Sequence, residues 1–246
     1  MRWLRGFLYW FVTRSGFAWL VGSLFGTKIF DENGSITIPE GATPQMRSGI
    51  LFNAYEYSER YLIRRWLPRD ADVVELGASI GIVSREILNR IDEQHGLFAV
   101  EAVEGLAQLA EANLARLHVS SRWRVLTAAV AYNVSEVFFN ADQEHVAGRI
   151  VGKTAQGDPR VRRVPARTLS SIIDQFDLSD YSLVMDIEGA EHELIAHEKE
   201  TLSKCRCVIA ELHGNPGDRD VFCQTLEAIG MRLVERKHSV AAFIRQ

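Results

Sequence analysis

The chain is 246 residues long, 47% of its residues are hydrophobic, and its formal net charge is −4. This length suits one domain of ordinary size, alone or with an accessory segment, and the apolar content is enough for a continuous core. The net charge provides no basic field, which argues against nucleic acid as a partner. Three cysteines in a chain of this length make no disulfide framework, so we expect a protein of the reducing cytoplasm.

Residues 1–30 differ from the rest of the chain, because they combine basic and aromatic residues with no acidic residue. They lack the uninterrupted apolar stretch and the small-residue cleavage site of a signal peptide. A membrane-spanning helix would place Arg14 near mid-bilayer, at a cost of about 2.5–3.5 kcal/mol. We therefore expect residues 1–45 to form an N-terminal segment, and residues 46–246 to form the folded domain. The segment is expected to be a flap docked on the protein or on a second copy in a homodimer, or to make peripheral membrane contact.

The first half of the chain alternates between strand-like and helical patterns. Such alternation predicts an α/β fold, in which helices cover both faces of a mostly parallel sheet. Pro68 ends the longest of the helical patterns. The expected strands are residues 36–39, 72–76, 96–101 and 122–128, and the expected helices are residues 48–67, 80–89 and 104–117.

The second half continues the alternation after an interruption. Short β-rich pieces at residues 134–140 and 149–151 predict a hairpin inserted between a strand and a helix. The last two strands follow each other closely, so we expect an antiparallel end to the sheet. The remaining expected strands are residues 181–187, 205–212, 232–236 and 240–245, and the expected helices are residues 168–176, 191–202 and 218–228.

The segment 73–81 reads Val-Val-Glu-Leu-Gly-Ala-Ser-Ile-Gly and joins an expected strand to an expected helix. Ligands of open α/β sheets bind beyond the carboxyl ends of the strands, where Gly77 and Gly81 let the chain turn tightly. A dinucleotide site has the spacing Gly-x-Gly-x-x-Gly, whose middle glycine admits the pyrophosphate. Here Ser79 takes that position, and Glu75 would repel a phosphate. Glycines after a strand are also common in ordinary turns, but this loop favours S-adenosylmethionine (SAM), with Glu75 beside its cationic methionine portion.

Glu101 ends the next expected strand, twenty-six residues after Glu75. A carboxylate at this place can accept hydrogen bonds from both hydroxyls of a ribose. The alternative is a solvated glutamate before a helix, but the order strand, acid, glycine turn, helix, strand, acid favours a cofactor site. After the third strand, the small residues around Ala129 suit contact with an adenine ring.

Three segments further along resemble the FkbM family of methyltransferases. Residues 182–191 contain an Asp-x-Glu-Gly-Ala-Glu block typical of the family, residues 208–213 resemble its next strand, which ends in Glu-x-His, and residues 167–173 resemble the helix entry before the block. The family often has lysine where this chain has Met185, and aspartate where it has Ser171. The resemblance covers roughly residues 55 to 245. It implies a Rossmann-like class I methyltransferase with a mostly parallel seven-stranded sheet, acting mainly on hydroxyl groups of sugars, glycolipids or natural products.

Methyl transfer to an unactivated hydroxyl needs an acceptor held close to the methyl group and a base for the proton. Asp186 and His213 are expected to end neighbouring strands, and either can serve as the base, with Glu188 orienting the acceptor or holding a loop. The acids can instead cap the helix that follows, since acidic residues are favoured at helix N-termini. Two carboxylates near a histidine could hold Mg²⁺, but the spacing does not require a metal.

The sequence therefore predicts a SAM-dependent O-methyltransferase acting on a small-molecule or glycan acceptor. A second hypothesis is an NAD-type or nucleotide-sugar oxidoreductase on a related sheet, against which the glycine spacing argues. A third is a non-catalytic binding protein attached to a membrane by residues 1–30. The acids Glu75, Glu101 and Asp186, together with His213, argue against loss of activity.

Overall fold

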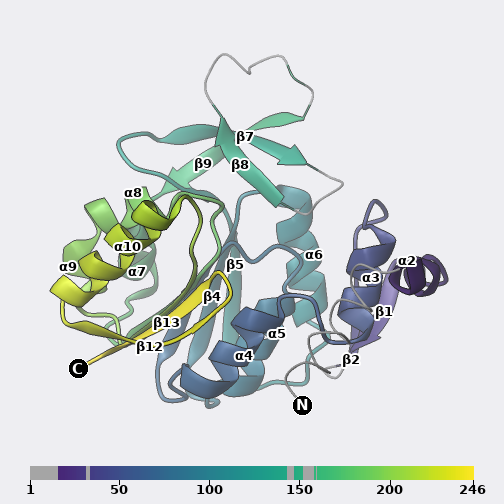
Figure 1. Ribbon diagram of the computed structural model, residues 1–246, viewed down its shortest axis with the longest axis horizontal. Helices are drawn as coiled ribbons and strands as arrows, with labels where there is room; N and C mark the ends of the chain where they lie inside the picture. The colour runs from purple at the N-terminus through teal and green to yellow at the C-terminus, as the bar shows by residue number, and fades with distance from the viewer. Residues whose placement is uncertain (1–15, 32–33, 143–146, 152–157, 159) are drawn as a thin grey trace.

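The computed structural model describes residues 16–31, 34–142, 147–151, 158 and 160–246. A seven-stranded sheet forms its centre (Figure 1), with the strand order β12-β13-β11-β10-β3-β4-β5. Five strands are parallel, and β13 pairs antiparallel with both β11 and β12. The predicted sheet and its antiparallel C-terminal pair are therefore confirmed. The strands are β3 (Asp72–Leu76), β4 (Gly96–Glu101), β5 (Arg122–Thr127), β10 (Tyr181–Met185), β11 (Cys207–Glu211), β12 (Met231–Lys237) and β13 (Val240–Arg245).

Helices cover both faces of this sheet, because neighbouring residues of a strand point to opposite faces. Val74 and Leu183 belong to a core cluster with α7 to α10, whereas Val73 and Val184 belong to a second cluster with α4 to α6. The two groups of helices lie on either side of the strands in Figure 1. The helices are α4 (Tyr57–Trp66), α5 (Ile82–Arg90), α6 (Glu104–Leu114), α7 (Leu169–Phe176), α8 (Glu191–His197), α9 (Lys199–Leu202) and α10 (Pro216–Ala228).

The insertion after β5 is larger than the predicted hairpin. It forms a four-stranded sheet of order β6-β9-β7-β8, drawn at the top of Figure 1. The sequence analysis missed β9, whose Pro165 lacks an N–H donor and whose arginines give it a polar pattern. Only Val164 of this strand is buried. The strands are β6 (Ala129–Val130), β7 (Glu136–Asp142), β8 (Ala147–Val151) and β9 (Val161–Arg167).

The helix expected over residues 48–67 is in fact two helices. The first, α3 (Pro44–Leu51), ends before Asn53, and α4 begins after Glu56. Both Asn53 and Glu56 have left-handed backbone conformations, with φ of 55° and 51°. Such a conformation cannot continue a right-handed helix, so the chain changes direction here. The turn brings residues 55 and 56 to the carboxyl ends of the central strands.

The N-terminal residues of the described chain form α2 (Gly16–Ser23) and a hairpin of β1 (Lys28–Asp31) and β2 (Gly34–Thr37). Ile29 and Ile36 of this hairpin are buried in one cluster with Ile80 and Ile82, which follow the glycine turn. The hairpin therefore shares a core with the segment that follows β3. The expectations for residues 1–30 fall partly on residues 1–15, which lie outside the described residues.

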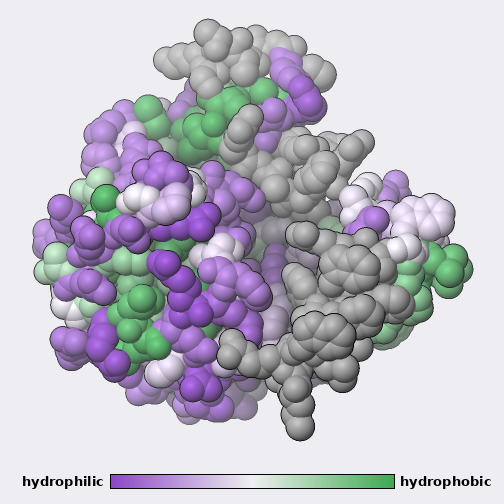
Figure 2. All heavy atoms as spheres, in the orientation of Figure 1, coloured by the Kyte–Doolittle hydropathy of each residue, from purple (hydrophilic) through white to green (hydrophobic). Residues whose placement is uncertain are grey.

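Apolar side chains are exposed on α2 and β1, and Figure 2 shows hydrophobic surface at the right-hand edge of the molecule, over α2. Trp19 and Leu20 are more than half exposed, and so is Phe30. Within the described residues, every helix is too short or too polar to cross a lipid bilayer.

Candidate functional site

The turn after β3 lies against the loop after β10. Gly77 has a φ of +90°, and a Cβ built on it would lie 1.8 Å from the backbone oxygen of Asp186. The backbone N–H groups of Gly77 and Ala78 donate to the carbonyl of Val100 on β4. Gly81 also has a positive φ, and a Cβ there would lie 3.3 Å from Ala110 of α6. The two glycines thus permit a close approach to β10 at one end of the turn and to α6 at the other.

Glu101 closes the same turn from β4. Its Oε2 accepts a hydrogen bond from the backbone N–H of Ser79 at 2.7 Å, and its Oε1 accepts from Val103 at 2.8 Å. Burial raises the pKa of Glu101. Each oxygen of a carboxylate has two acceptor sites, so both can still receive a hydrogen bond from a ligand. Ser79 has a φ of +50°, and its buried Oγ has no partner.

Glu75 lies deeper than Glu101. It is 2% exposed, and its Oε2 accepts a hydrogen bond from the hydroxyl of Ser84 at 2.5 Å. Burial raises the pKa of Glu75 to about 7. The two acids thus end or nearly end adjacent parallel strands with the glycine turn between them. Glu101 reaches the main crevice, whereas Glu75 lines a smaller cavity behind it.

The main crevice has a volume of about 470 Å³, within the usual range of small-molecule sites. Tyr55 and Glu56 line it from the loop before α4, and Phe139 and Ile150 line it from the insertion. The remaining walls follow the carboxyl ends of β3, β4, β5 and β10. They consist of Gly77, Ser79, Val100, Glu101, Ala102, Ala128, Ala129, Val130, Asp186, Ile187, Glu188, Gly189, Ala190 and Glu193.

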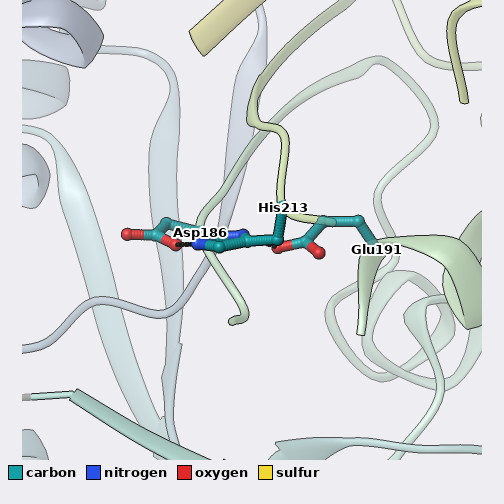
Figure 3. Close-up of side chains that lie close together, drawn as sticks. All are labelled: Asp186, Glu191 and His213. Carbon is teal, nitrogen blue, oxygen red and sulfur yellow. Dashed lines mark hydrogen bonds and ion pairs between the residues drawn. The ribbon is translucent and has the colours of Figure 1, made fainter. Parts of the chain in front are cut away.

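A histidine lies between carboxylates beside this crevice, and two of these carboxylates, Asp186 and Glu188, line it. Figure 3 shows the imidazole of His213 between Asp186 and Glu191. Nδ1 of His213 lies 3.0 Å from Oε1 of Glu191, and Nε2 lies 3.7 Å from Oδ1 of Asp186 and 3.5 Å from Oε2 of Glu188. The three predicted catalytic residues, Asp186, Glu188 and His213, are therefore neighbours in space, and Glu191 joins them.

The charges within this cluster change the pKa values of its residues. The hydrogen bond with Glu191 is the largest of the effects that raise the pKa of His213 to about 9. Burial, and then the charge of Glu211, raise the pKa of Asp186. Because Asp186 and His213 interact, their titrations are coupled, and protons bind to the pair rather than to either residue alone. Such a pair can hold or accept a proton at the crevice.

Four polar residues of this region were not predicted as site residues: Tyr55, Glu56, Glu59 and Glu211, the last of which is the glutamate of the Glu-x-His strand end. Glu59 is only 5% exposed, and Glu211 accepts a hydrogen bond from the hydroxyl of Ser239 at 2.7 Å. The spacing alone indicates that Glu59 faces inward. It lies four residues after Tyr55 and three before Leu62, which places all three on one side of the expected helix. Burial of an acid on that side was the unexpected feature.

Two groups of described side chains bring possible metal ligands together. In each group, one ligand atom per residue lies within 4.8 Å of the others. The first group is Asp186, Glu191 and His213, and the second is Glu59, Asp186 and Glu211.

Comparisons with solved structures return Rossmann-like proteins of low sequence identity. A protein of the NADB-Rossmann superfamily from Streptococcus agalactiae is 12% identical, with 76% of this chain and 68% of that chain covered and a TM-score of 0.47. Fibrillarin from Aeropyrum pernix, solved with natively bound S-adenosyl-L-methionine, is 9% identical, with coverages of 77% and 73% and a TM-score of 0.44. A SAM-dependent methyltransferase from Aquifex aeolicus is 14% identical, with coverages of 76% and 87% and a TM-score of 0.41.

No curated protein matches the chain in sequence. The family model of the methyltransferase FkbM domain, however, matches residues 75–241. This match includes the glycine turn, Glu101, the insertion and the cluster around His213, and it spans more than half of the chain. The chain therefore belongs to the FkbM methyltransferase family.

Proposed function

We propose that the protein is a SAM-dependent methyltransferase that methylates a hydroxyl group on a sugar, a glycolipid or a natural product. The observation that carries this proposal is the crevice at the carboxyl ends of β3 and β4, where Gly77, Ser79 and Glu101 meet. Ligands of open α/β sheets bind at this place. The family of the chain supports the same reaction class.

The residues of the crevice fit SAM. The close approach at Gly77 leaves no room for a side chain, so backbone faces the bound molecule. The buried hydroxyl of Ser79 has no partner, and Glu101 offers a free acceptor site on each oxygen for a ribose. Ala129 lies in the wall beyond β5, where it suits an adenine. When bound, SAM supplies an electrophilic methyl group.

The residues at the other end would prepare the acceptor. Glu188 is 40% exposed in its side chain and can hold a hydroxyl by accepting its hydrogen bond. The proton released as the hydroxyl oxygen is methylated passes to the pair of Asp186 and His213. Glu191 keeps the imidazole oriented, because its Oε1 binds Nδ1 of His213 and also accepts from the backbone N–H of Ile187.

The insertion would contribute to acceptor choice. Phe139 and Ile150 line the crevice together with the acids, so an acceptor meets both apolar side chains and carboxylates. A sugar suits both, because it has an apolar face of C–H groups and hydroxyls at its rim. This pairing favours a carbohydrate acceptor.

The test is transfer of labelled methyl groups from SAM to a lipid and polysaccharide extract of the producing cells. We expect the labelled product to be stable to mild alkali, as a methyl ether is. The His213→Ala variant should form no labelled product but should bind S-adenosylhomocysteine with wild-type affinity. Label released by mild alkali would indicate a methyl ester and contradict hydroxyl methylation. Equal loss of affinity and turnover in the variant would show that His213 serves the structure instead.

A further inference from the structure

A second, much smaller cavity lies behind the crevice, between α4 and the ends of β3 and β10. Its volume is about 10 Å³, which is space for roughly one water molecule or ion. Four carboxylates line it: Glu56, Glu59, Glu75 and Asp186. Its other walls are apolar side chains and the glycine turn. Four acids around a space of this size repel one another when they are ionised, and a bound cation removes that repulsion.

Two of these carboxylates are buried and have at least one oxygen without a partner. Glu59 is 5% exposed, and its carboxylate makes no hydrogen bond or ion pair with any described residue. Oε1 of Glu75, which is 2% exposed, also has no hydrogen-bond partner. A buried ionised group is stable only when it is paired, hydrogen-bonded or bound to a metal. Both side chains therefore point to a ligand in the cavity.

The geometry suits a single ion beside this cavity, where Glu211, which does not line the cavity, approaches Glu59 and Asp186. One carboxylate oxygen from each of Glu59, Asp186 and Glu211 lies within 4.8 Å of the other two. Ligand oxygens on opposite sides of Mg²⁺ or Ca²⁺ are roughly 4–5 Å apart, because each bond is about 2.0–2.6 Å long. The hydroxyl of Ser239 donates to Oε1 of Glu211 and orients that carboxylate, as outer partners of metal ligands do.

The other possible ligand group, Asp186 with Glu191 and His213, is less suited to an ion. Nδ1 of His213 and Oε1 of Glu191 are already hydrogen-bonded to each other at 3.0 Å. The same oxygen accepts from the backbone N–H of Ile187. An ion there would have to displace both hydrogen bonds, whereas no described hydrogen bond joins Glu59, Asp186 and Glu211 to one another.

We propose that Glu59, Asp186 and Glu211 bind one hard divalent cation, with Glu75 and Glu56 beside it. With the ion bound, Asp186 stays ionised, and His213 is the member of its pair that takes up the proton. An all-oxygen ligand set of this kind selects Mg²⁺, Mn²⁺ or Ca²⁺ over softer metals. The ion joins α4 to the ends of β10 and β11, three elements that are distant in sequence. It thereby fixes the loop with Tyr55 and Glu56 at the edge of the crevice.

The experiment is a titration of the metal-free full-length protein with Mn²⁺, Mg²⁺ and Ca²⁺ separately, without cofactor or acceptor. Binding is followed by calorimetry. For Mn²⁺, it is also followed by the loss of the electron paramagnetic resonance signal of the free ion. We expect one ion per chain and a melting temperature that rises with ion concentration, because the folded state binds the ion. Glu59→Gln and Glu211→Gln should weaken binding by about tenfold or more, since even loss of outer partners typically weakens metal sites 10- to 100-fold.

The matched control is Glu227→Gln, an exposed glutamate on α10 that should bind the ion as the wild type does. Glu59→Gln keeps the size of the side chain and removes a repelling charge, so it should melt no lower than the metal-free wild type. Absence of binding to the wild type would overturn the proposal, and so would equal binding by Glu59→Gln and Glu211→Gln. Because the titration needs neither cofactor nor acceptor, its failure would leave the proposed function standing.

Discussion

Three non-glycine residues with left-handed backbones border the crevice: Glu56, Ser79 and Glu188, with φ between 50° and 52°. This conformation is costly for residues with a side chain, and it persists where the surroundings hold it. The hydrogen bond from the N–H of Ser79 to Glu101 stabilises this conformation at Ser79. Backbone strain of this kind concentrates at functional sites. Here the three residues lie in three different loops: before α4, after β3 and after β10.

Gly77 should be sensitive to substitution, because its φ is positive and a Cβ there meets the backbone of Asp186. Gly77→Ala is expected to lower the free energy of unfolding by about 3 kcal/mol, from backbone strain and overpacking together. It should also abolish S-adenosylhomocysteine binding. Both effects are measured by chemical denaturation and calorimetry.

The control for this substitution is Gly105→Ala. Gly105 lies in the first turn of α6, and a Cβ there has no heavy atom within 4 Å. Alanine is favoured over glycine in a helix, so this variant should be as stable as the wild type or slightly more stable. Equal stability of Gly77→Ala and Gly105→Ala would show that the close approach at Gly77 is not needed.

At the scale of elements, three strands were predictable to the residue, whereas β10 and β11 are shorter than the expected residues 181–187 and 205–212. The sequence analysis expected residues 72–76, 96–101 and 240–245, and β3, β4 and β13 have these bounds. Their continuous apolar runs are typical of strands buried on both faces. Helix breaks were not predictable, because the helical spacing of residues 48–67 continues through the left-handed Asn53 and Glu56. The same holds for the helix expected over residues 191–202, which divides at Glu198 into α8 and α9.

Asn113 joins three elements around the N-terminal hairpin. Its side chain accepts from the N–H of Thr37 on β2, and it donates to the carbonyls of Thr37 and Ile80. Asn113 is fully buried in α6. Asn113→Ala should therefore lower the free energy of unfolding by about 2 kcal/mol or more, because buried backbone groups lose their partners.

Asn89→Ala on the exposed side of α5 is the control, since it makes the same change of helix propensity without a described side-chain bond. Chemical denaturation of both variants separates propensity from hydrogen bonding. If the two variants were equally stable, the contacts of Asn113 would not hold the hairpin to the sheet.

For the whole molecule, the order of strands explains which site residues could be predicted. Glu75 and Glu101 lie at the ends of β3 and β4, and Asp186 and His213 follow β10 and β11. The carboxyl ends of these strands meet at one edge of the sheet, so the pattern of strands placed all four residues at that edge. The contributions from outside the strands needed the structure. Phe139 belongs to an insertion with little pattern of its own. Glu59 reaches the site from α4, which packs over β11 and β13.

The measurement closest to the central claim is calorimetric titration of the full chain with S-adenosylhomocysteine and, separately, with NAD. We expect the wild type to bind S-adenosylhomocysteine and not NAD. Glu101→Ala should bind it at least about tenfold more weakly, because two hydrogen bonds to a charged group are lost. Glu104→Ala, an exposed neighbour on α6, should match the wild type. Failure of the wild type to bind S-adenosylhomocysteine, or unchanged affinity in Glu101→Ala, would contradict the placement of the cofactor between β3 and β4.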